Sequence, residues 1–329
     1  MPRSIKMATI ISELELLIDQ SWLQQLVQQL YAELAQVGLG NFQPIAYFGD
    51  EWFSPDGIAA ISIPFFLANK ELQKIEMHQM GWVEGGTQDE CMKLLRHESG
   101  HCFDHFFETS KLPDFQKIFG DPKKPYMPDF FLGKPFSKNF VKHLDRTYSQ
   151  SHPAEDFAEC FATVVTPRLD WKKKYKNAEK VLRKLEWTQL QINIHSKSDT
   201  SKLPIKEPEF YNQKNLNLSL KSYYAKRIRH LKHFHLLKKD KELKRIFNSQ
   251  KDEPQKKSRR LLRPYQKSLM SIANAKSFYK YQIKEYINEL EMRCYHLGLT
   301  ENDKVHQNKT LELKSLVEDT LYKRHFMVK

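Results

Sequence analysis

The chain has 329 residues, of which 40% are hydrophobic and 12% aromatic, so it can bury a sizeable core and is not intrinsically disordered. No run of residues approaches the length of a membrane span, and the four cysteines form no CxxC pair, which argues against a secreted disulfide framework. Glu13, Glu15 and Asp19 interrupt the apolar N-terminal stretch, so we expect no signal peptide and a cytoplasmic protein.

The formal net charge of +13 is unevenly distributed along the chain. Residues 1–200 carry a net charge of −3, whereas residues 201–329 carry +16. The basic excess therefore lies in the C-terminal part. It is compatible with a nucleic-acid partner, with an acidic protein or membrane surface, or with a plain solvated helical extension.

The N-terminal part is predicted to combine one helix with short strands. A helix is expected over residues 12–37, with Ser12 as its N-cap. Residues 45–48 and 57–68 look extended, and the second run is bounded by a Pro-Asp-Gly turn. An edge strand over 57–68 could pair with an extended peptide substrate, although Pro64 removes one hydrogen-bond donor.

Two helices are predicted in the middle of the chain. Thr87 and Glu90 have capping-box spacing, so a helix should run from residue 88 to about 109. Residues 110–145 are rich in Pro, Phe and Lys and are predicted to be an ordered loop region. A second helix is expected from Pro153, which suits a first helical position, to about residue 166.

Apolar residues recur at helical spacing through the rest of the chain. The predicted helices are 178–194, 218–248, 266–297 and 310–324. The stretch 196–215 reads as a linker between the two parts.

The first of the two middle helices contains an HExxH pattern, formed by His97, Glu98 and His101. Residues i and i+4 of a helix lie about 5–6 Å apart at Cβ, so both imidazoles can converge on one zinc ion. Glu98 points about 100° away and can act as general base toward a metal-activated water. A surface histidine pair is the alternative, but the clean separation of apolar and polar faces favours a metal site. Gly100 would permit close approach of another backbone.

A third ligand is required, because catalytic zinc has three protein ligands and an open position. The pattern HExxHxxGxxH is excluded, since Asp104 and Phe107 replace its Gly and its third His. Glu155 and Glu159 share one stripe of the second helix, so we take Glu155 as the ligand and Glu159 as support for a ligand. Asp156 lies off that stripe and is the weaker choice. A solvated acidic helix face is the alternative interpretation.

Three further residues are candidates for supporting roles. Tyr148 precedes Glu155 by seven residues and could donate a hydrogen bond to the oxyanion of a tetrahedral intermediate, with His143 as a rival for this role. Asp104 lies one turn beyond His101 and could hold a ligand imidazole in the correct tautomer. An ordinary polar residue on an exposed helix face is the alternative for Asp104.

These residues resemble the zincin superfamily, in the branch that combines HExxH with a distant Glu. The segment from Tyr148 to Glu159 is similar to the Y-x6-E-x-F-A-E segment of lethal-factor-type peptidases, which implies an oxyanion role for Tyr148 and zinc binding by Glu155. Residues from about 45 to 190, a little under half of the chain, resemble a bacterial family of zinc-binding metallopeptidases. The segments that carry this resemblance are GIAAISIPFFLA, EGGTQDECMKLLRHESGHCFD, YSQSHPAEDFAECFATVVTP and WKKKYKNAEKVLRKLEW.

The sequence and this resemblance together predict an α+β protein. A zincin-like catalytic domain with a small sheet and an active-site helix is expected over residues 1–195, followed by the linker 196–215 and a basic, mainly α-helical region at 216–329. The expected activity is hydrolysis of peptide bonds in a peptide or protein substrate, with one Zn²⁺ ion and Glu98 as general base. The alternative is a non-catalytic protein that binds nucleic acid or an acidic partner through its C-terminal helices.

Overall fold

The computed structural model describes the chain in two compact units. Unit 1 comprises residues 1–75 and 83–220, and unit 2 comprises residues 76–82 and 221–329. The described residues are 5–80, 83–126, 137–144, 148–204, 206–209, 212–231, 239–249, 261–272, 283, 286–287, 290–291, 293–294, 297–300 and 307–326.

The described residues are mainly helical, with two short two-stranded sheets. The α-helices are α1 (Leu23–Gln36), α2 (Lys70–Met80), α3 (Gln88–Phe107), α4 (Pro113–Phe119), α5 (Pro153–Val165), α6 (Trp171–Lys174), α7 (Glu179–His195), α8 (Leu220–Leu231), α9 (Asp240–Ile246), α10 (Gln266–Met270) and α13 (Gln307–Phe326). The strands are β1 (Ile45–Gly49), β2 (Ala60–Pro64), β3 (Asn248–Ser249) and β4 (Leu299–Thr300). This architecture agrees with the predicted α+β class.

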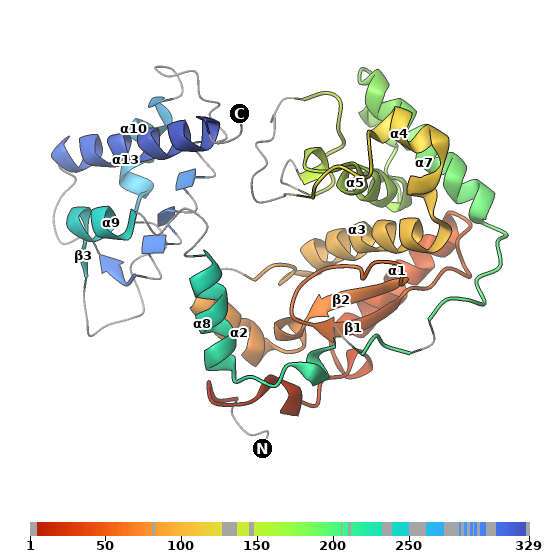
Figure 1. The fold of residues 1–329 in the computed structure, drawn as a ribbon, viewed down its shortest axis with the longest axis horizontal. Coiled ribbons are helices and arrows are strands. Elements are labelled where there is room, and N and C mark those ends of the chain that lie inside the picture. Colours follow the sequence, from red (N-terminus) through yellow and green to blue (C-terminus); the bar gives the residue numbers. More distant parts are fainter. Residues whose placement is uncertain are drawn as a thin grey trace. The chain divides into compact units, whose positions relative to one another are not determined.

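Helix α3 lies at the centre of unit 1. Figure 1 shows α5 and α7 on one side of α3, with α1 and the β1–β2 sheet on the other. The Thr87 hydroxyl accepts a hydrogen bond from the Glu90 N–H at 3.2 Å, so the cap predicted for this helix is confirmed. Buried aromatic rings pack around the two long helices, among them Phe103 and Phe157. Because both faces of α3 are covered, His97 and Glu98 of its HExxH pattern are buried and His101 is partly buried.

Helices α3 and α5 cross unusually closely at Gly100. A Cβ atom added there would lie 2.8 Å from the Cα of Ala158 and 3.0 Å from the Cβ of Phe161. Real Cβ atoms need more room, so only glycine permits this distance between the two backbones. The close approach expected at Gly100 is therefore confirmed, and it brings α5 within reach of the two histidines.

The first sheet differs from its prediction in extent and pairing. Strand β2 covers only residues 60–64 of the predicted 57–68, and it pairs in parallel with β1. The remaining N–H groups of β2 bond within the chain: Ala60 donates to the Ile58 carbonyl at 2.8 Å and Ser62 donates to the Phe53 carbonyl at 2.9 Å. A peptide substrate could therefore pair with this strand at these positions only by displacing the bonds that the chain makes with itself.

Several helix boundaries also differ from the sequence-based expectation. The helix predicted over 12–37 begins only at Leu23, and short 3₁₀ turns take the place of its first half. The loop predicted over 110–145 contains helix α4, which has Pro113 at its first turn. By contrast, α5 and α7 lie within one residue of the predicted 153–166 and 178–194.

The predicted linker 196–215 falls inside unit 1. Its Gln213 side chain donates hydrogen bonds to the carbonyls of Ile11 and Leu14, and Ser12 donates to Asn217 at 2.7 Å. These contacts join the end of unit 1 to its N-terminal residues. The division of the chain into functional domains stays a prediction.

Unit 2 has a hydrophobic core of its own, to which α9, α10 and α13 contribute. Some of its basic side chains form internal ion pairs: Arg293 pairs with Asp240, and Lys239 pairs with Asp319 at 2.7 Å. Of the predicted helices, 218–248 is observed as α8 and α9, with 232–238 outside the described residues. Most of 266–297 also lies outside them. Helix α13 contains the predicted 310–324.

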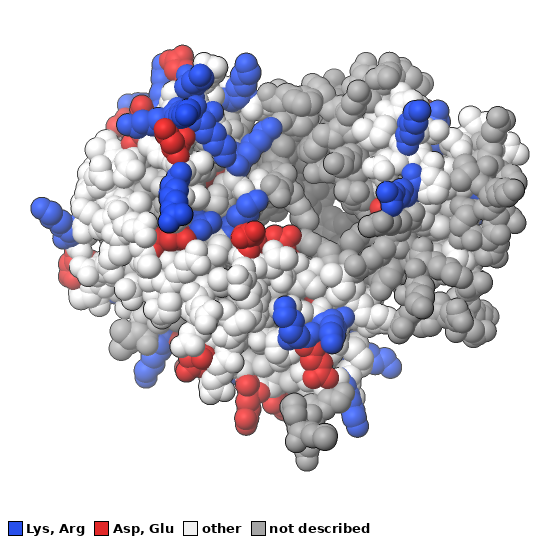
Figure 2. Space-filling view, turned by 180° about the vertical axis from the view of Figure 1, so that it is seen from behind, with Lys and Arg blue, Asp and Glu red and all other residues white. Residues whose placement is uncertain are grey.

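The surface carries charges of both signs. On the face drawn in Figure 2, Lys and Arg side chains lie among Asp and Glu side chains over much of the described surface. Among the described helices, none is both long and apolar enough to cross a membrane.

Candidate metal centre

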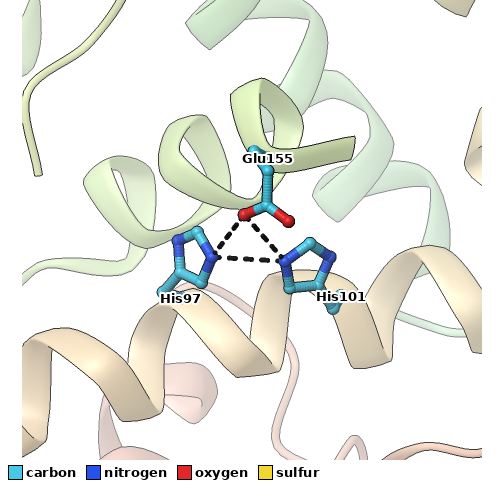
Figure 3. A group of neighbouring side chains, drawn as sticks. All are labelled: His97, His101 and Glu155. Atoms are coloured by element: carbon cyan, nitrogen blue, oxygen red, sulfur yellow. Dashed lines mark hydrogen bonds and ion pairs between the residues drawn. The ribbon is translucent and has the colours of Figure 1, made fainter. Parts of the chain in front are cut away.

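Two histidines of α3 and one glutamate of α5 bring three ligand atoms to one point (Figure 3). The Nε2 atoms of His97 and His101 lie 3.2 Å apart. The Oε2 atom of Glu155 lies 2.9 Å from the His97 Nε2 and 3.3 Å from the His101 Nε2. Glu155 is more than 50 residues from the two histidines in sequence, yet the three predicted ligands are adjacent in space.

This triangle fits a tetrahedral metal ion. Zinc–ligand bonds of about 2.0–2.1 Å at tetrahedral angles place ligand atoms about 3.3–3.4 Å apart. The three observed separations, 2.9, 3.2 and 3.3 Å, approach that spacing without any rearrangement of the backbone. Two imidazoles and one carboxylate also form a donor set typical of catalytic zinc. The three residues could thus hold one ion and leave its fourth corner open.

Glu159 supports the first histidine from behind. Its Oε1 atom lies 3.1 Å from the His97 Nδ1, while the backbone N–H groups of His143 and Leu144 donate to its Oε2 at 3.0 and 3.1 Å. Burial alone would lower the pKa of His97, but its hydrogen bonds to Glu155 and Glu159 raise that pKa well above the usual value. The two carboxylates therefore favour positive charge at this point, whether a proton or a metal ion supplies it.

Glu98 is buried beside the ligands, and one of its carboxyl oxygens makes no hydrogen bond to the described residues. Its side chain is 6% exposed, and its Oε2 has no hydrogen-bond partner among the residues that the structure describes. Burial raises the pKa of Glu98, although the charges of His101 and His97 oppose this shift. A buried carboxyl group with an unused oxygen is suited to receive and return a proton.

Tyr148 lies at the site through a contact that the sequence did not predict. Its hydroxyl is 2.6 Å from that of Tyr126, which in turn donates to the Oε1 of Glu155 at 2.9 Å. The ring of Tyr148 also lies over His97, with centroids 5.9 Å apart. Burial and the Glu155 charge raise the pKa of both tyrosines, so both hydroxyls keep their protons. Tyr126 falls in a Pro- and Lys-rich stretch without periodicity, so no pattern singled it out.

Two supporting predictions do not match the geometry. Asp104 faces no ligand imidazole: its Oδ1 accepts hydrogen bonds from the Thr109 hydroxyl and the Ser110 N–H, both at 2.6 Å. It therefore closes the C-terminal end of α3. The His143 imidazole bonds the carbonyl of Lys93 at 3.0 Å, and burial lowers its pKa to about 4. His143 contributes its backbone N–H to the site rather than its ring.

A buried ion pair fastens the loop that supports Glu159. The Lys184 Nζ of α7 donates to the Asp156 Oδ2 at 2.5 Å and to the Asn139 carbonyl at 2.8 Å, and it lies 4.2 Å from the ring centre of Phe140. Burial raises the pKa of Asp156 to about 7 even though Lys184 lowers it. Asp156, the weaker ligand candidate, thus pairs with Lys184 and not with the two histidines.

Comparison with known proteins agrees with this geometry. No curated protein and no solved structure matches the chain. Residues 91–200, which include both histidines and Glu155, match the model of a family described as "putative zinc-binding metallo-peptidase". That segment is 110 of the 329 residues. Over this third of its length, the chain is therefore similar to a family described as zinc-binding metallopeptidases, which are hydrolases.

Proposed function

We propose that the chain hydrolyses peptide bonds at a single zinc ion held by His97, His101 and Glu155. The observation that carries this proposal is the convergence of three ligand atoms within 3.3 Å of one another at a buried point. The match to a zinc-binding metallopeptidase family over the same residues supports it. A zinc ion at this point would supply a Lewis acid that polarises a carbonyl group and acidifies water.

The residues around the ligands have separate roles in proton transfer, in stabilising the oxyanion and in orienting a ligand. Glu98 takes a proton from the attacking water and later returns it to the leaving amine, a role to which its raised pKa and its unpartnered oxygen are suited. Tyr148 donates a hydrogen bond to the oxygen on which negative charge develops. Glu159 fixes the His97 ring in the orientation that turns Nε2 toward the metal.

The direct test compares zinc content and peptide hydrolysis in three variants of the full chain. Glu98→Gln should keep zinc and lose hydrolysis by at least about a hundredfold, because it removes only the proton carrier. His97→Ala should lose both. Glu90→Gln, on the exposed first turn of the same helix, is the matched control and should change neither. Cleavage of a mixed peptide library should stop when a chelator is added. Undiminished hydrolysis by Glu98→Gln would contradict the mechanism, and a parent protein without zinc would contradict the site.

The location, the substrate and a possible partner complete this proposal. A cytoplasmic location agrees with four buried cysteines that form no disulfide. The substrate is a peptide or protein, because that is what metallopeptidases cleave. A nucleic-acid or acidic partner at the basic C-terminal region stays a prediction, and the internal ion pairs of unit 2 give it no support.

A further inference from the structure

The hydroxyl of Tyr126 links the metal-binding carboxylate to the tyrosine proposed for the oxyanion. It donates its proton to the Glu155 Oε1 at 2.9 Å. A hydroxyl carries one proton, so in the 2.6 Å contact between the two tyrosines Tyr126 must accept and Tyr148 must donate. Both bonds of the Tyr126 oxygen are thus directed, and both end on proposed members of the site.

The position of Tyr126 is supported by a second set of contacts. The His152 Nδ1 accepts from the Ala154 N–H at 3.1 Å, so the proton of this ring lies on Nε2, which donates to the Lys124 carbonyl at 2.9 Å. The rings of Tyr126 and His152 meet edge to face, with centroids 5.4 Å apart. His152, at the start of α5, therefore holds the chain at Lys124, two residues before Tyr126.

As a result, the two carboxylate oxygens of Glu155 have different partners. Oε2 faces both histidine Nε2 atoms, whereas Oε1 is held by Tyr126. If the carboxylate turned both oxygens to the metal, the second would take up space that the open fourth position requires. We propose that Tyr126 is a positioning residue that keeps Glu155 bound to the metal through one oxygen and holds the Tyr148 hydroxyl beside the site. This inference rests on the proposed function of the His97, His101 and Glu155 group.

The same bond defines a resting position for Tyr148. Its only proton is given to Tyr126, so Tyr148 must release that bond to donate to a substrate oxygen. Tyr126 thus keeps Tyr148 within the site while no substrate is bound, linked to Glu155 through the Tyr126 hydroxyl.

The test uses the full-length protein and three Tyr→Phe variants, with zinc affinity measured by competition with a fluorescent chelator and no substrate present. Tyr126→Phe should weaken zinc binding about tenfold, as expected for the loss of a hydrogen bond to a ligand. Tyr148→Phe touches no ligand oxygen and should bind zinc like the parent but lose hydrolysis. Tyr31→Phe is the control, because it also removes a part-buried tyrosine hydroxyl bond, but one to the Pro44 carbonyl at 2.7 Å rather than to a ligand.

Cobalt substitution supplies a readout that a merely structural role would not change. In Tyr126→Phe the visible Co²⁺ absorption should weaken, because a second Glu155 oxygen raises the coordination number above four. Thermal unfolding in chelator should show that all three variants fold. Parent-like zinc affinity and an unchanged Co²⁺ spectrum in Tyr126→Phe would overturn this inference while leaving the proposed function intact. A parent protein that binds no zinc would overturn both.

Discussion

Replacing Gly100 with alanine tests whether the close crossing of α3 and α5 builds the metal site. The new Cβ would meet the Ala158 Cα at 2.8 Å, whereas carbon atoms in contact settle at about 3.5–4.0 Å. Helix α5 would therefore have to move away by about 0.7–1.2 Å. Overpacking of this kind lowers the free energy of unfolding by about 1–3 kcal/mol, and the higher helix propensity of alanine raises it by about 1 kcal/mol. We expect a net loss of about 0–2 kcal/mol in the free energy of unfolding.

The effect of Gly100→Ala on metal binding should be larger than its effect on the fold. Metal–ligand distances tolerate only about ±0.2 Å, and Glu155 lies on the helix that must move. We expect zinc affinity, measured by chelator competition, to fall at least about tenfold. Gly40→Ala is the control, since its Cβ would meet nothing closer than 3.6 Å. If Gly100→Ala bound zinc as tightly as the parent and melted no earlier, the crossing would not position the site.

Two further predictions concern the buried groups behind the ligands. Folding lowers the pKa of His143 from 6.5 to about 4, so below pH 6.5 the unfolded chain binds more protons than the folded one, and stability falls as the pH decreases toward 4. Between pH 7.5 and 5 the parent should lose about 2 kcal/mol more stability than His143→Gln, measured by urea unfolding in chelator, and equal losses would exclude a buried neutral imidazole. Lys184→Met leaves Asp156 buried without its partner and should cost about 3 kcal/mol at pH 8. The cost should shrink below pH 6, because folding raises the pKa of Asp156 to about 7 and the group is then neutral; a cost independent of pH would contradict this pairing.

The parts of the fold that the sequence predicted correctly are those with strong local signals. Helix α3 has a capping box and a clean amphipathic pattern, and α5 has Pro153 at its first turn, so both were placed nearly to the residue. The HExxH spacing predicts two histidines on one face of α3, and the acidic stripe of α5 singles out Glu155 and Glu159, whose carboxylates lie beside His97 in the structure. Their convergence could be expected, since a catalytic zinc site needs a third ligand.

What the sequence did not predict depends on long-range contacts. Asp104 shares the polar face of α3 with the histidines, but the turn after the helix brings Thr109 and Ser110 to its carboxylate. Ser12 begins an apolar pattern that looks helical, yet its segment bonds to residues 216–218 and forms 3₁₀ turns instead. Tyr126 reaches Glu155 only because the start of α5 holds its segment in place.

The hydrogen bonds that β2 already makes within the chain restrict how a peptide could bind along this strand. The N–H groups of Ala60 and Ser62 are already used, Pro64 has none, and the Ala60 carbonyl receives the thiol of Cys102 at 3.4 Å. A peptide laid along that strand would have to displace these bonds before it could pair with the same main-chain groups. A peptide that binds along β2 would therefore have to gain more from its own contacts than is lost when these internal bonds open.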